Sequence, residues 1–481
     1  MNKKLILKAL GLILLCEGAA MVPSLLMTFY FSEKDWQAFI ISIIITLLAG
    51  GLMTALGTGA QGNVGYREGF AVAAFGWIIL AGFGSLPYML TGVLPNPVDA
   101  YFETMSGFTT TGASVITDVE ILSHGMLLWR SLTHWLGGMG IIVLTVALIP
   151  SLKIAGLQMF KAEVPGPTKS KVLPRIAQTS RELYKIYLLI TAAEIILLTL
   201  AGMDLFDSFI HTFGTVATGG FSSKGASIAA YDSFLIEIII VFFMVICGMN
   251  FALHYYSMRG NFRPTLRDPE ARLYIGIILA ATAFITIDLV LNMNYEAGQA
   301  ARYSIFQVSS IITTTGYASA DFDQWPSFSK MVLLILMFIG GCAGSTGGSI
   351  KVSRILIMFK GISRQITKLL HPQAVIPLRV GKDIIPQDVA DNVQTFFFLY
   401  FIIFGASVLV VSSFGVDLVS SISAVAATLG NVGPGFGIVG PMSNYYSLPT
   451  AAKAVLSLCM IVGRLELYTL LVIMSSKFWR S

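Results

Sequence analysis

Long stretches of almost uninterrupted apolar residues recur from one end of the sequence to the other. An α-helix needs about 20 such residues to cross the roughly 30 Å hydrocarbon core of a bilayer, and most of the stretches reach that length. They occupy residues 9–31, 38–56, 70–94, 127–149, 186–201, 234–253, 274–291, 331–339, 396–411 and 451–473. Only 12% of the 481 residues are charged, against about a quarter in soluble proteins. The sequence therefore predicts an all-α polytopic membrane protein with about ten crossings and no separate soluble domain.

Three lysines, Lys3, Lys4 and Lys8, precede the first apolar stretch and raise the question of a signal peptide. The stretch is longer than the apolar core of a signal peptide and lacks a cleavage site of small residues. We expect a first helix that is retained in the membrane.

The distribution of basic residues predicts which side of the membrane each loop faces, because lysine and arginine are concentrated in cytoplasmic loops. Three loops carry most of them: Lys153, Lys161, Lys169, Lys171, Arg175, Arg181 and Lys185 in the first, Arg259, Arg263, Arg267 and Arg272 in the second, and Lys351, Arg354, Lys360, Arg364, Lys368, Arg379 and Lys382 in the third. We therefore predict that these loops and both termini are cytoplasmic.

The segments between these loops are poor in basic residues and carry carboxylates instead. These are Asp99, Glu103, Asp118 and Glu120 in residues 93–123, and Asp204, Asp207 and Asp232 in residues 204–232, where Lys224 is the one basic residue. Carboxylates at the outer mouth of a pore would raise the local cation concentration. The alternative, which we favour for any single carboxylate, is an ordinary polar residue at the membrane interface.

Four outer connections resemble one another and reveal an internal repeat. They are residues 99–112, 207–220, 303–316 and 420–433, and each ends in a glycine. Successive glycines are about 100 residues apart, a period that identifies four copies of one structural unit. Each copy begins with an amphipathic stretch of about ten residues, too short to cross the bilayer, and then breaks at Thr/Gly-rich sequence.

Breaks at the same place in four copies predict a selectivity filter. Non-helical backbone at membrane depth is tolerated only where it is buried in protein or lines a water-filled cavity. Four such segments around one axis would form a ring of backbone carbonyls, which can replace the hydration shell of a cation. The short helices would direct their negative C-terminal ends at the same point. We therefore predict one pore lined by four unequal helix–half-helix–helix units.

A second repeated feature is glycine in the helix that follows each filter segment. The first copy has Gly137-Gly138-Met139-Gly140, the second Gly248 and the fourth Gly463. Small residues let transmembrane helices pack closely, and we expect this role in the first two copies. The third copy has a Gly- and Ser-rich run at residues 340–348, which predicts an irregular loop below the filter. The run lacks the Gly-Lys-Ser/Thr ending of a nucleotide-binding P-loop.

Arg464 lies inside the last apolar stretch, where an arginine is costly and rarely faces lipid. Glu466 is two residues away and does not share a helical face with it, which argues against a salt bridge between the two. We therefore place Arg464 on the pore axis. Together with the loop at residues 340–348 it is the predicted gate, separate from the filter above it.

These residues resemble the Trk/Ktr/HKT superfamily of potassium transporters. The four filter motifs are Phe108-Thr-Thr-Thr-Gly-Ala-Ser114, Ala217-Thr-Gly-Gly-Phe-Ser222, Thr313-Thr-Thr-Gly-Tyr317 and Asn431-Val-Gly-Pro-Gly-Phe-Gly437. Motifs at residues 136–142, 340–348 and 463–466 narrow the resemblance to the bacterial membrane subunits of the TrkH/TrkG type. The resemblance covers essentially the whole chain, including two additional N-terminal helices.

The resemblance implies a potassium filter, a gate and a set of partners. The implied filter consists of Thr110, Thr111, Gly112, Thr218, Gly219, Gly220, Thr314, Thr315, Gly316, Asn431, Val432 and Gly433. Within it, K+ would be held at Thr111, Gly112, Gly219, Gly220, Thr315, Gly316, Val432 and Gly433. The implied gate consists of Gly344, Ser345, Thr346, Gly347, Gly348 and Arg464. The implied setting is a homodimer among the lipids of the bacterial inner membrane, on a cytosolic TrkA-type ring that binds the regulatory nucleotide. Apart from the transported K+ no cofactor is implied for this chain, and no nucleic acid.

The chain then divides into five predicted units. Residues 1–66 form two N-terminal transmembrane helices, and residues 67–160, 161–262, 263–370 and 371–481 form the four pore repeats, the third with the intramembrane gating loop. The fourth filter offers Asn431-Val432 where the first and third offer two threonines. We therefore expect a filter that is less symmetric than four identical segments would give.

A carrier with alternating access, coupled to protons or sodium, is the main alternative to a gated channel. No carboxylate is an obvious proton relay, although Glu194, Glu237, Asp288 and Glu466 are candidates, so the sequence favours a channel. An intramembrane enzyme would need a metal motif or a nucleophile–base pair, and the five histidines are scattered without a His-Glu-x-x-His pattern. We therefore predict no catalytic residues.

Overall fold

The computed structural model describes residues 1–59, 65–140, 176–381 and 383–479. Over these residues the chain is helical apart from one short antiparallel hairpin, β1 (Arg379–Val380) and β2 (Asp383–Ile384). The predicted all-α membrane fold is confirmed. Among the described residues, six helices are long and apolar enough to cross a membrane, or eight if two bent helix pairs are each one span. Of the other two predicted crossings, 127–149 lies partly outside the described residues, and 331–339 belongs to a helix of 12 residues.

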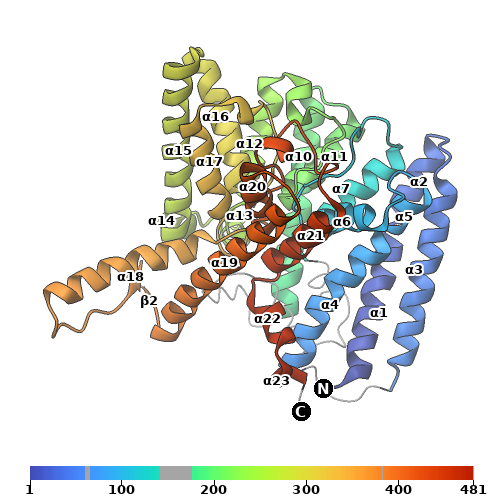
Figure 1. Ribbon diagram of the computed structural model, residues 1–481, viewed down its shortest axis with the longest axis horizontal. Helices are drawn as coiled ribbons and strands as arrows, with labels where there is room; N and C mark the ends of the chain where they lie inside the picture. Colours follow the sequence, from blue (N-terminus) through green and yellow to red (C-terminus); the bar gives the residue numbers. More distant parts are fainter. Residues whose placement is uncertain (60–64, 141–175, 382, 480–481) are drawn as a thin grey trace.

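Three N-terminal helices form a layer at one side of the bundle (Figure 1). They are α1 (Lys3–Ala20), α2 (Val22–Tyr30) and α3 (Trp36–Leu56). Glycines allow α1 and α3 to pack closely, since a Cβ added at Gly11 would lie 2.6 Å from the carbonyl oxygen of Gly50. Such backbone contact between small residues is typical of helix pairs in membranes.

Each of the four repeats contributes an outer helix, a short pore helix and an inner helix. The outer helices are α4 (Tyr66–Gly84), which α5 (Leu86–Leu90) extends, α10 (Ile176–Leu200), α15 (Pro269–Met293) and α19 (Gln387–Ser413). The pore helices are α6 (Pro97–Phe108), α11 (Leu205–Ala217), α16 (Ala297–Ile312) and α20 (Leu418–Leu429). The inner helices begin with α7 (His124–Gly138), α12 (Phe234–Cys247), α17 (Ser327–Phe338) and α21 (Thr450–Arg464). The predicted unit boundaries stay predictions, and the one at 160/161 lies outside the described residues.

Three inner helices are interrupted close to their glycines. α12 bends by 103° at Gly248 into α13 (Phe251–Met258), and α21 bends by 112° into α22 (Tyr468–Met474). α17 ends at a loop that leads to α18 (Val352–Leu370). The predicted crossings at 234–253 and 451–473 therefore each consist of two helices that meet at a sharp bend. The close packing expected at Gly248 is present, since an added Cβ there would lie 2.4 Å from the Tyr274 hydroxyl. The breaks free backbone groups, which bind the loop at residues 340–348 or turn through positive φ at Glu466 and Leu467.

Both chain ends lie near each other on one face of the bundle (Figure 1). The short helix α14 (Arg263–Arg267), the long helix α18 and the terminal α23 (Ser476–Trp479) complete this side. Three 3₁₀ turns, η2 (Ser227–Tyr231), η3 (Phe322–Gln324) and η4 (Gly437–Val439), lie in the connections that follow the last three filter segments.

Candidate functional site

The four pore helices begin at polar caps and end where the backbone cannot continue as a helix. The side chains of Asn96, Asp204 and Asp417 each accept a hydrogen bond from a backbone N–H of the first turn, as N-cap residues do. Asp417 is exposed, and the hydrogen bonds that it accepts from Ser420 lower the pKa of its carboxyl. These helices direct their carbonyl ends toward the Thr/Gly-rich segments that follow.

The same backbone conformation follows all four pore helices. Two residues before the filter glycine, a non-glycine residue has a positive φ in every repeat: 54° at Thr110, 57° at Thr218, 60° at Thr314 and 54° at Asn431. A β-branched residue rarely adopts this conformation, so its recurrence at one register indicates a constrained turn. The glycines themselves have φ values of 81°, 81°, 82° and 101° at Gly112, Gly220, Gly316 and Gly433.

The filter glycines and their neighbours form a closed ring. A Cβ added at each glycine would collide with the carbonyl oxygen of the residue before the next repeat's glycine. The distances are 2.1 Å from Gly112 to Gly219, 1.9 Å from Gly220 to Thr315, 2.1 Å from Gly316 to Val432 and 2.6 Å from Gly433 to Thr111. Each repeat thus touches the next, and the fourth touches the first. The structure therefore brings together the residues that the sequence predicts for all four filter segments.

Side-chain hydrogen bonds also join the filter segments, and the fourth segment differs from the others. The hydroxyls of Thr109 and Thr111 lie 2.8 Å apart, as do those of Thr313 and Thr315 in the third repeat. In the fourth repeat the amide of Asn431 donates to the Thr111 hydroxyl at 2.9 Å and to the carbonyl of Met460 at 3.0 Å. Asn431 therefore ties the fourth filter segment to the first one and to α21.

Arg464 is the last residue of α21 and contacts the lower end of the first filter segment. Its guanidinium donates to the Thr110 hydroxyl at 3.3 Å, the Thr346 carbonyl at 3.0 Å and the Gly138 carbonyl at 3.1 Å. It also bonds to the carbonyl of Gly137. Arg464 therefore bridges α7, the loop and the first filter segment, and the separation of gate from filter stays a prediction.

The loop at residues 340–348 contacts two further filter segments. The hydroxyl of Thr346 lies 3.3 Å from that of Thr218, and the backbone N–H of Gly348 donates to the Thr314 hydroxyl at 2.7 Å. Arg464 and the loop thus contact the positive-φ residue of each of the first three repeats. The predicted gate residues lie together at one end of the ring.

The loop is anchored on the break in the second repeat. The N–H of Cys342 donates to the Gly248 carbonyl at 2.8 Å, and the N–H of Phe251 donates to the Gly344 carbonyl at 3.1 Å. The hydroxyl of Ser345 closes a local turn on the carbonyl of Cys342. These bonds use backbone groups that a continuous helix would have satisfied internally.

Two charged side chains hold the loop from the other direction. The carboxylate of Glu270, at the start of α15, accepts hydrogen bonds from the N–H of Ala343 within the loop, at 2.6 Å, and from the N–H of Ser353 in the first turn of α18, at 2.9 Å. The buried ammonium of Lys351 donates to the carbonyl of Gly347. No sequence pattern pointed to Glu270, which is 73 residues from Ala343 along the chain.

Glu466 pairs with Arg354 rather than with Arg464. The Arg354 guanidinium donates to both oxygens of Glu466 and stacks 3.9 Å over the ring of Phe396. The prediction of no Arg464–Glu466 salt bridge agrees with this geometry. Two other relay candidates are also occupied: Glu237 binds Arg302 at 2.8 Å, and Asp288 accepts hydrogen bonds from Ser329.

A cavity of about 140 Å³ opens on the opposite side of the ring from Arg464. The filter glycines, Arg130, Lys224 and Tyr445 are among the residues that line it. Of the carboxylates predicted near this mouth, Asp99 is bound to Lys453 at 2.8 Å and Glu103 to Arg130 at 2.7 Å. Both are buried, so they act as polar residues within the protein rather than as free charges at the pore mouth.

A set of bracing residues was not identified from the sequence. They occupy the ninth position before each filter glycine and are Glu103, His211, Gln307 and Ala424. The first three contact Ser114, Ser222 and Ser319 just after the glycines, at 3.0, 2.9 and 3.5 Å. In the fourth repeat the neighbouring Ser423 accepts from the N–H of Phe436 at 2.9 Å. Aligning the four copies on their glycines would have found three polar residues at this position. His211 is fully buried.

Four short pore helices that meet at a ring of carbonyls define a class of membrane protein, the pore-loop cation channels and transporters. A family described as "TrkH: Cation transport protein" matches residues 35–481. The Trk system potassium uptake proteins TrkH of Halomonas elongata and Escherichia coli K12 are 42% and 39% identical over all of both chains. TrkG of Escherichia coli K12 is 36% identical over 98% of this chain and 97% of its own.

The solved structure of the potassium transporter TrkH from Vibrio parahaemolyticus gives the same result. It is 35% identical and covers all of both chains, with a TM-score of 0.91. The chain belongs to the TrkH family of cation transport proteins. The resemblance inferred from the filter motifs is thereby confirmed, and the family is one of transporters rather than enzymes.

Proposed function

We propose that this chain takes up potassium across the bacterial inner membrane through a gated, potassium-selective pore, with both termini in the cytoplasm. The observation that carries the proposal is the closed ring of glycine–carbonyl contacts between the four repeats. Carbonyl oxygens that surround one axis can replace the water shell of a cation. The relatives named as potassium uptake proteins support potassium as the ion.

The proposed ion ligands are the backbone carbonyls of the filter segments. They belong to Thr111, Gly112, Gly219, Gly220, Thr315, Gly316, Val432 and Gly433, which lie between the outer cavity and Arg464. The threonine hydroxyls at Thr111 and Thr315 are already engaged with neighbouring hydroxyls. The backbone therefore supplies the oxygens of the proposed sites.

Arg464 and the loop at residues 340–348 form the proposed gate in a closed state. The guanidinium lies next to the lowest filter residue, Thr110, where a cation leaving the filter would have to pass. Two unit charges about 4 Å apart at an effective dielectric constant of about 20 repel by about 4 kcal/mol. Opening would require Arg464 to leave the carbonyls of Gly138 and Thr346, and the loop to leave Gly248.

A cytosolic regulatory ring of the TrkA type is the proposed partner on the face that carries both chain ends. Exposed basic residues gather there, including Arg263, Arg267, Lys360 and Lys368. Glu270 lies three residues after α14 and binds the backbone of Ala343 in the loop and of Ser353 in α18, so a pull on α14 would reach the gate through one residue. The test is to reverse the charge of Arg263 and Arg267 and to measure binding of the ring. Binding should be abolished; if it is intact, these residues serve only to set the membrane topology.

A second copy of this chain is the proposed partner of α18. This helix extends away from the bundle (Figure 1) and exposes Phe359, Ile362, Ile366 and Leu369 along one face. The spacing of three and four residues places them in one apolar stripe. Light scattering in detergent should give the mass of a homodimer. The double substitution Ile362→Asp with Ile366→Asp should shift the measured mass toward that of the monomer. A monomeric parent protein would contradict the proposal.

Rubidium uptake into liposomes tests the proposed transport function. The purified chain should take up radioactive rubidium against a low background, and external potassium should compete while sodium should compete much less. Empty liposomes and liposomes with the protein in denatured form are the controls. Uptake that sodium and potassium suppress equally would contradict a potassium-selective pore.

A proton- or sodium-coupled symporter with alternating access is the second candidate. The observation in its favour is that the carboxyl groups of Glu17 and Glu194 are fully buried and have no hydrogen-bond partner among the described residues. The hydroxyl of Thr215, next to Glu194, donates to the carbonyl of His211 instead. An imposed pH gradient should leave rubidium uptake unchanged in a channel and should drive it in a proton symporter, where Glu194→Gln would remove the effect.

A further inference from the structure

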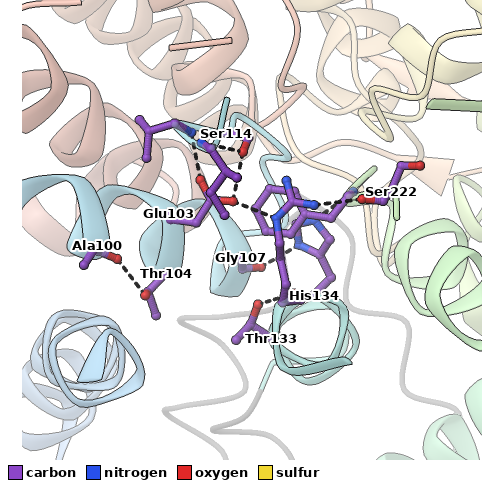
Figure 2. A network of polar contacts seen from close by, with 12 residues as sticks. Ala100, Glu103, Thr104, Gly107, Ser114, Thr133, His134 and Ser222 are labelled. Atoms are coloured by element: carbon purple, nitrogen blue, oxygen red, sulfur yellow. Dashed lines mark hydrogen bonds and ion pairs between the residues drawn. The ribbon is translucent and has the colours of Figure 1, made fainter. Parts of the chain in front are cut away.

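A buried ion pair lies behind the first filter segment, and its arginine also lines the outer cavity. The Arg130 side chain, on α7, donates from Nε to Oε1 of Glu103, on the pore helix α6, at 2.7 Å. The two side chains are 4% and 0% exposed. Figure 2 shows Glu103 in a network that reaches Ser114 in the first repeat and Ser222 in the second. Burying two charges is costly unless the rest of their hydrogen-bonding groups are also satisfied.

Glu103 also accepts hydrogen bonds from the chain segment that follows the first filter segment. Its carboxylate accepts from the Ser114 hydroxyl at 3.0 Å and from the backbone N–H of Val115 at 2.8 Å. These residues follow Gly112 by two and three positions. The carboxylate therefore fixes the exit of filter segment 1 to its own pore helix.

Arg130 extends the same network to the second filter segment. Its NH1 group donates to the carbonyl of Ser222 at 2.9 Å, and the guanidinium lies 3.7 Å over the ring of Phe221. These residues follow Gly220 directly. Hydrogen bonds from a charged donor are stronger than neutral ones. One side chain thus joins the exits of filter segments 1 and 2, behind the point where Gly112 meets Gly219.

His134, one turn further along α7, makes a second connection between the same segments. Its Nε2 accepts from the backbone N–H of Phe221 at 3.2 Å, so its Nδ1 carries the proton and donates to the carbonyl of Gly107 at 2.7 Å. The imidazole is therefore neutral in this arrangement. Its ring also fills the space beside Gly219, where an added Cβ would lie 2.5 Å from Cγ.

Ion pairs also link other neighbouring repeats, Lys453 with Asp99 between the fourth and first and Arg302 with Glu237 between the third and second, but these pairs join helices rather than the segments that follow the filter glycines. Between the second and third segments, the Tyr317 hydroxyl lies 3.3 Å from the carbonyl of Phe221. Between the fourth and first, the N–H of Tyr445 donates to the carbonyl of Ser114 at 2.8 Å. At the junction between segments 1 and 2, by contrast, a buried ion pair is hydrogen-bonded to the residues that follow both filter glycines.

We propose that Arg130 is a positioning residue that fixes the distance between filter segments 1 and 2, with Glu103 and His134 as its supports, and thereby sets the discrimination between potassium and sodium. This inference rests on the proposed function of the ring as a potassium filter. Preference for one cation depends on the size of the carbonyl ring and on how far it can adapt. A ring whose neighbouring segments can separate or approach would accommodate the smaller sodium ion.

The test is the substitution Arg130→Lys, measured as the potassium-over-sodium permeability ratio from reversal potentials of reconstituted protein. Lysine keeps the charge and can pair with Glu103, but it cannot also bond to Ser222 and stack on Phe221. We expect the ratio to fall about tenfold, as for loss of a charged hydrogen bond, while potassium flux persists. The matched control is Arg302→Lys, which alters another Arg–Glu pair, with Glu237, and should leave the ratio unchanged.

A second variant separates positioning from folding. The double substitution Glu103→Gln with Arg130→Gln removes both charges together, so that no buried charge is left unpaired. It should also lower the ratio. An unchanged ratio in folded Arg130→Lys or in the folded double variant would overturn the inference, provided that the parent protein prefers potassium. If the parent shows no preference, the proposed function itself fails. If none of these variants folds while Arg302→Lys does, the pair serves stability and the positioning role is refuted.

Discussion

Replacing Gly316 by serine perturbs the carbonyl ring at one defined contact. A Cβ at this position would lie 2.1 Å from the carbonyl oxygen of Val432 and 2.8 Å from Cδ of Pro434, so the neighbouring filter segment must shift. The backbone also has a φ of 82°, which costs an L-residue about 1–2 kcal/mol. Both effects act on the junction between filter segments 3 and 4.

The expected change in the potassium-over-sodium permeability ratio follows from the backbone strain. If the strain of about 1–2 kcal/mol is relieved by moving the Val432 carbonyl, potassium loses a comparable part of its preference over sodium. Each 1.4 kcal/mol corresponds to a factor of ten, so the permeability ratio should fall about 5- to 30-fold. Potassium flux itself should change less, because three junctions of the ring are untouched.

Reversal potentials under bi-ionic conditions measure this ratio directly. The control is Gly298→Ser, in the same pore helix α16, where an added Cβ has nothing within 4 Å and the backbone needs no positive φ. We expect the control to match the parent protein. An unchanged ratio in folded Gly316→Ser would remove Gly316 from the filter and refute the reasoning from the ring.

Three further substitutions test the gate and the pore mouth. Arg464→Ala should raise rubidium flux into liposomes several-fold, because it removes a repulsion of several kcal/mol. Arg464→Lys keeps the charge and should not raise the flux. A folded alanine variant that conducts no faster than the parent would contradict the proposed gate. Glu270→Ala should also raise the flux, because it removes two hydrogen bonds to a charged acceptor, each of about 1.5–3 kcal/mol. A flux equal to that of the parent would show that other contacts hold the loop. Lys224→Gln should lower the potassium concentration that gives half-maximal flux, and the difference should shrink at high salt; a difference independent of salt would argue against an electrostatic role.

The parts of this protein that depend on local sequence were predictable. Long apolar stretches indicated the membrane helices, and the period of the Thr/Gly segments indicated the ring, because glycine is needed at the one position of each segment where φ is positive and the neighbouring carbonyl leaves no room for a Cβ. Gly112 and its three counterparts were therefore found without the structure.

The parts that depend on contacts between distant segments were not predictable. Hydropathy does not distinguish a straight helix from one that bends at Gly248, since both are equally apolar. Glu103 looked like an interfacial carboxylate until its partner Arg130 was placed beside it, 27 residues along the chain. Arg464 was expected below a separate filter, but its reach to Thr110 follows from the bend at the end of α21.

Crystals of the protein grown with thallium or rubidium in place of potassium would test the central claim most directly. The account predicts anomalous density on the axis of the ring, within coordination distance of the carbonyl oxygens of Thr111, Gly219, Thr315 and Val432, and its loss when sodium replaces the heavy cation. Density elsewhere in the protein, or sodium and thallium binding equally at the ring, would contradict a filter built from these four segments.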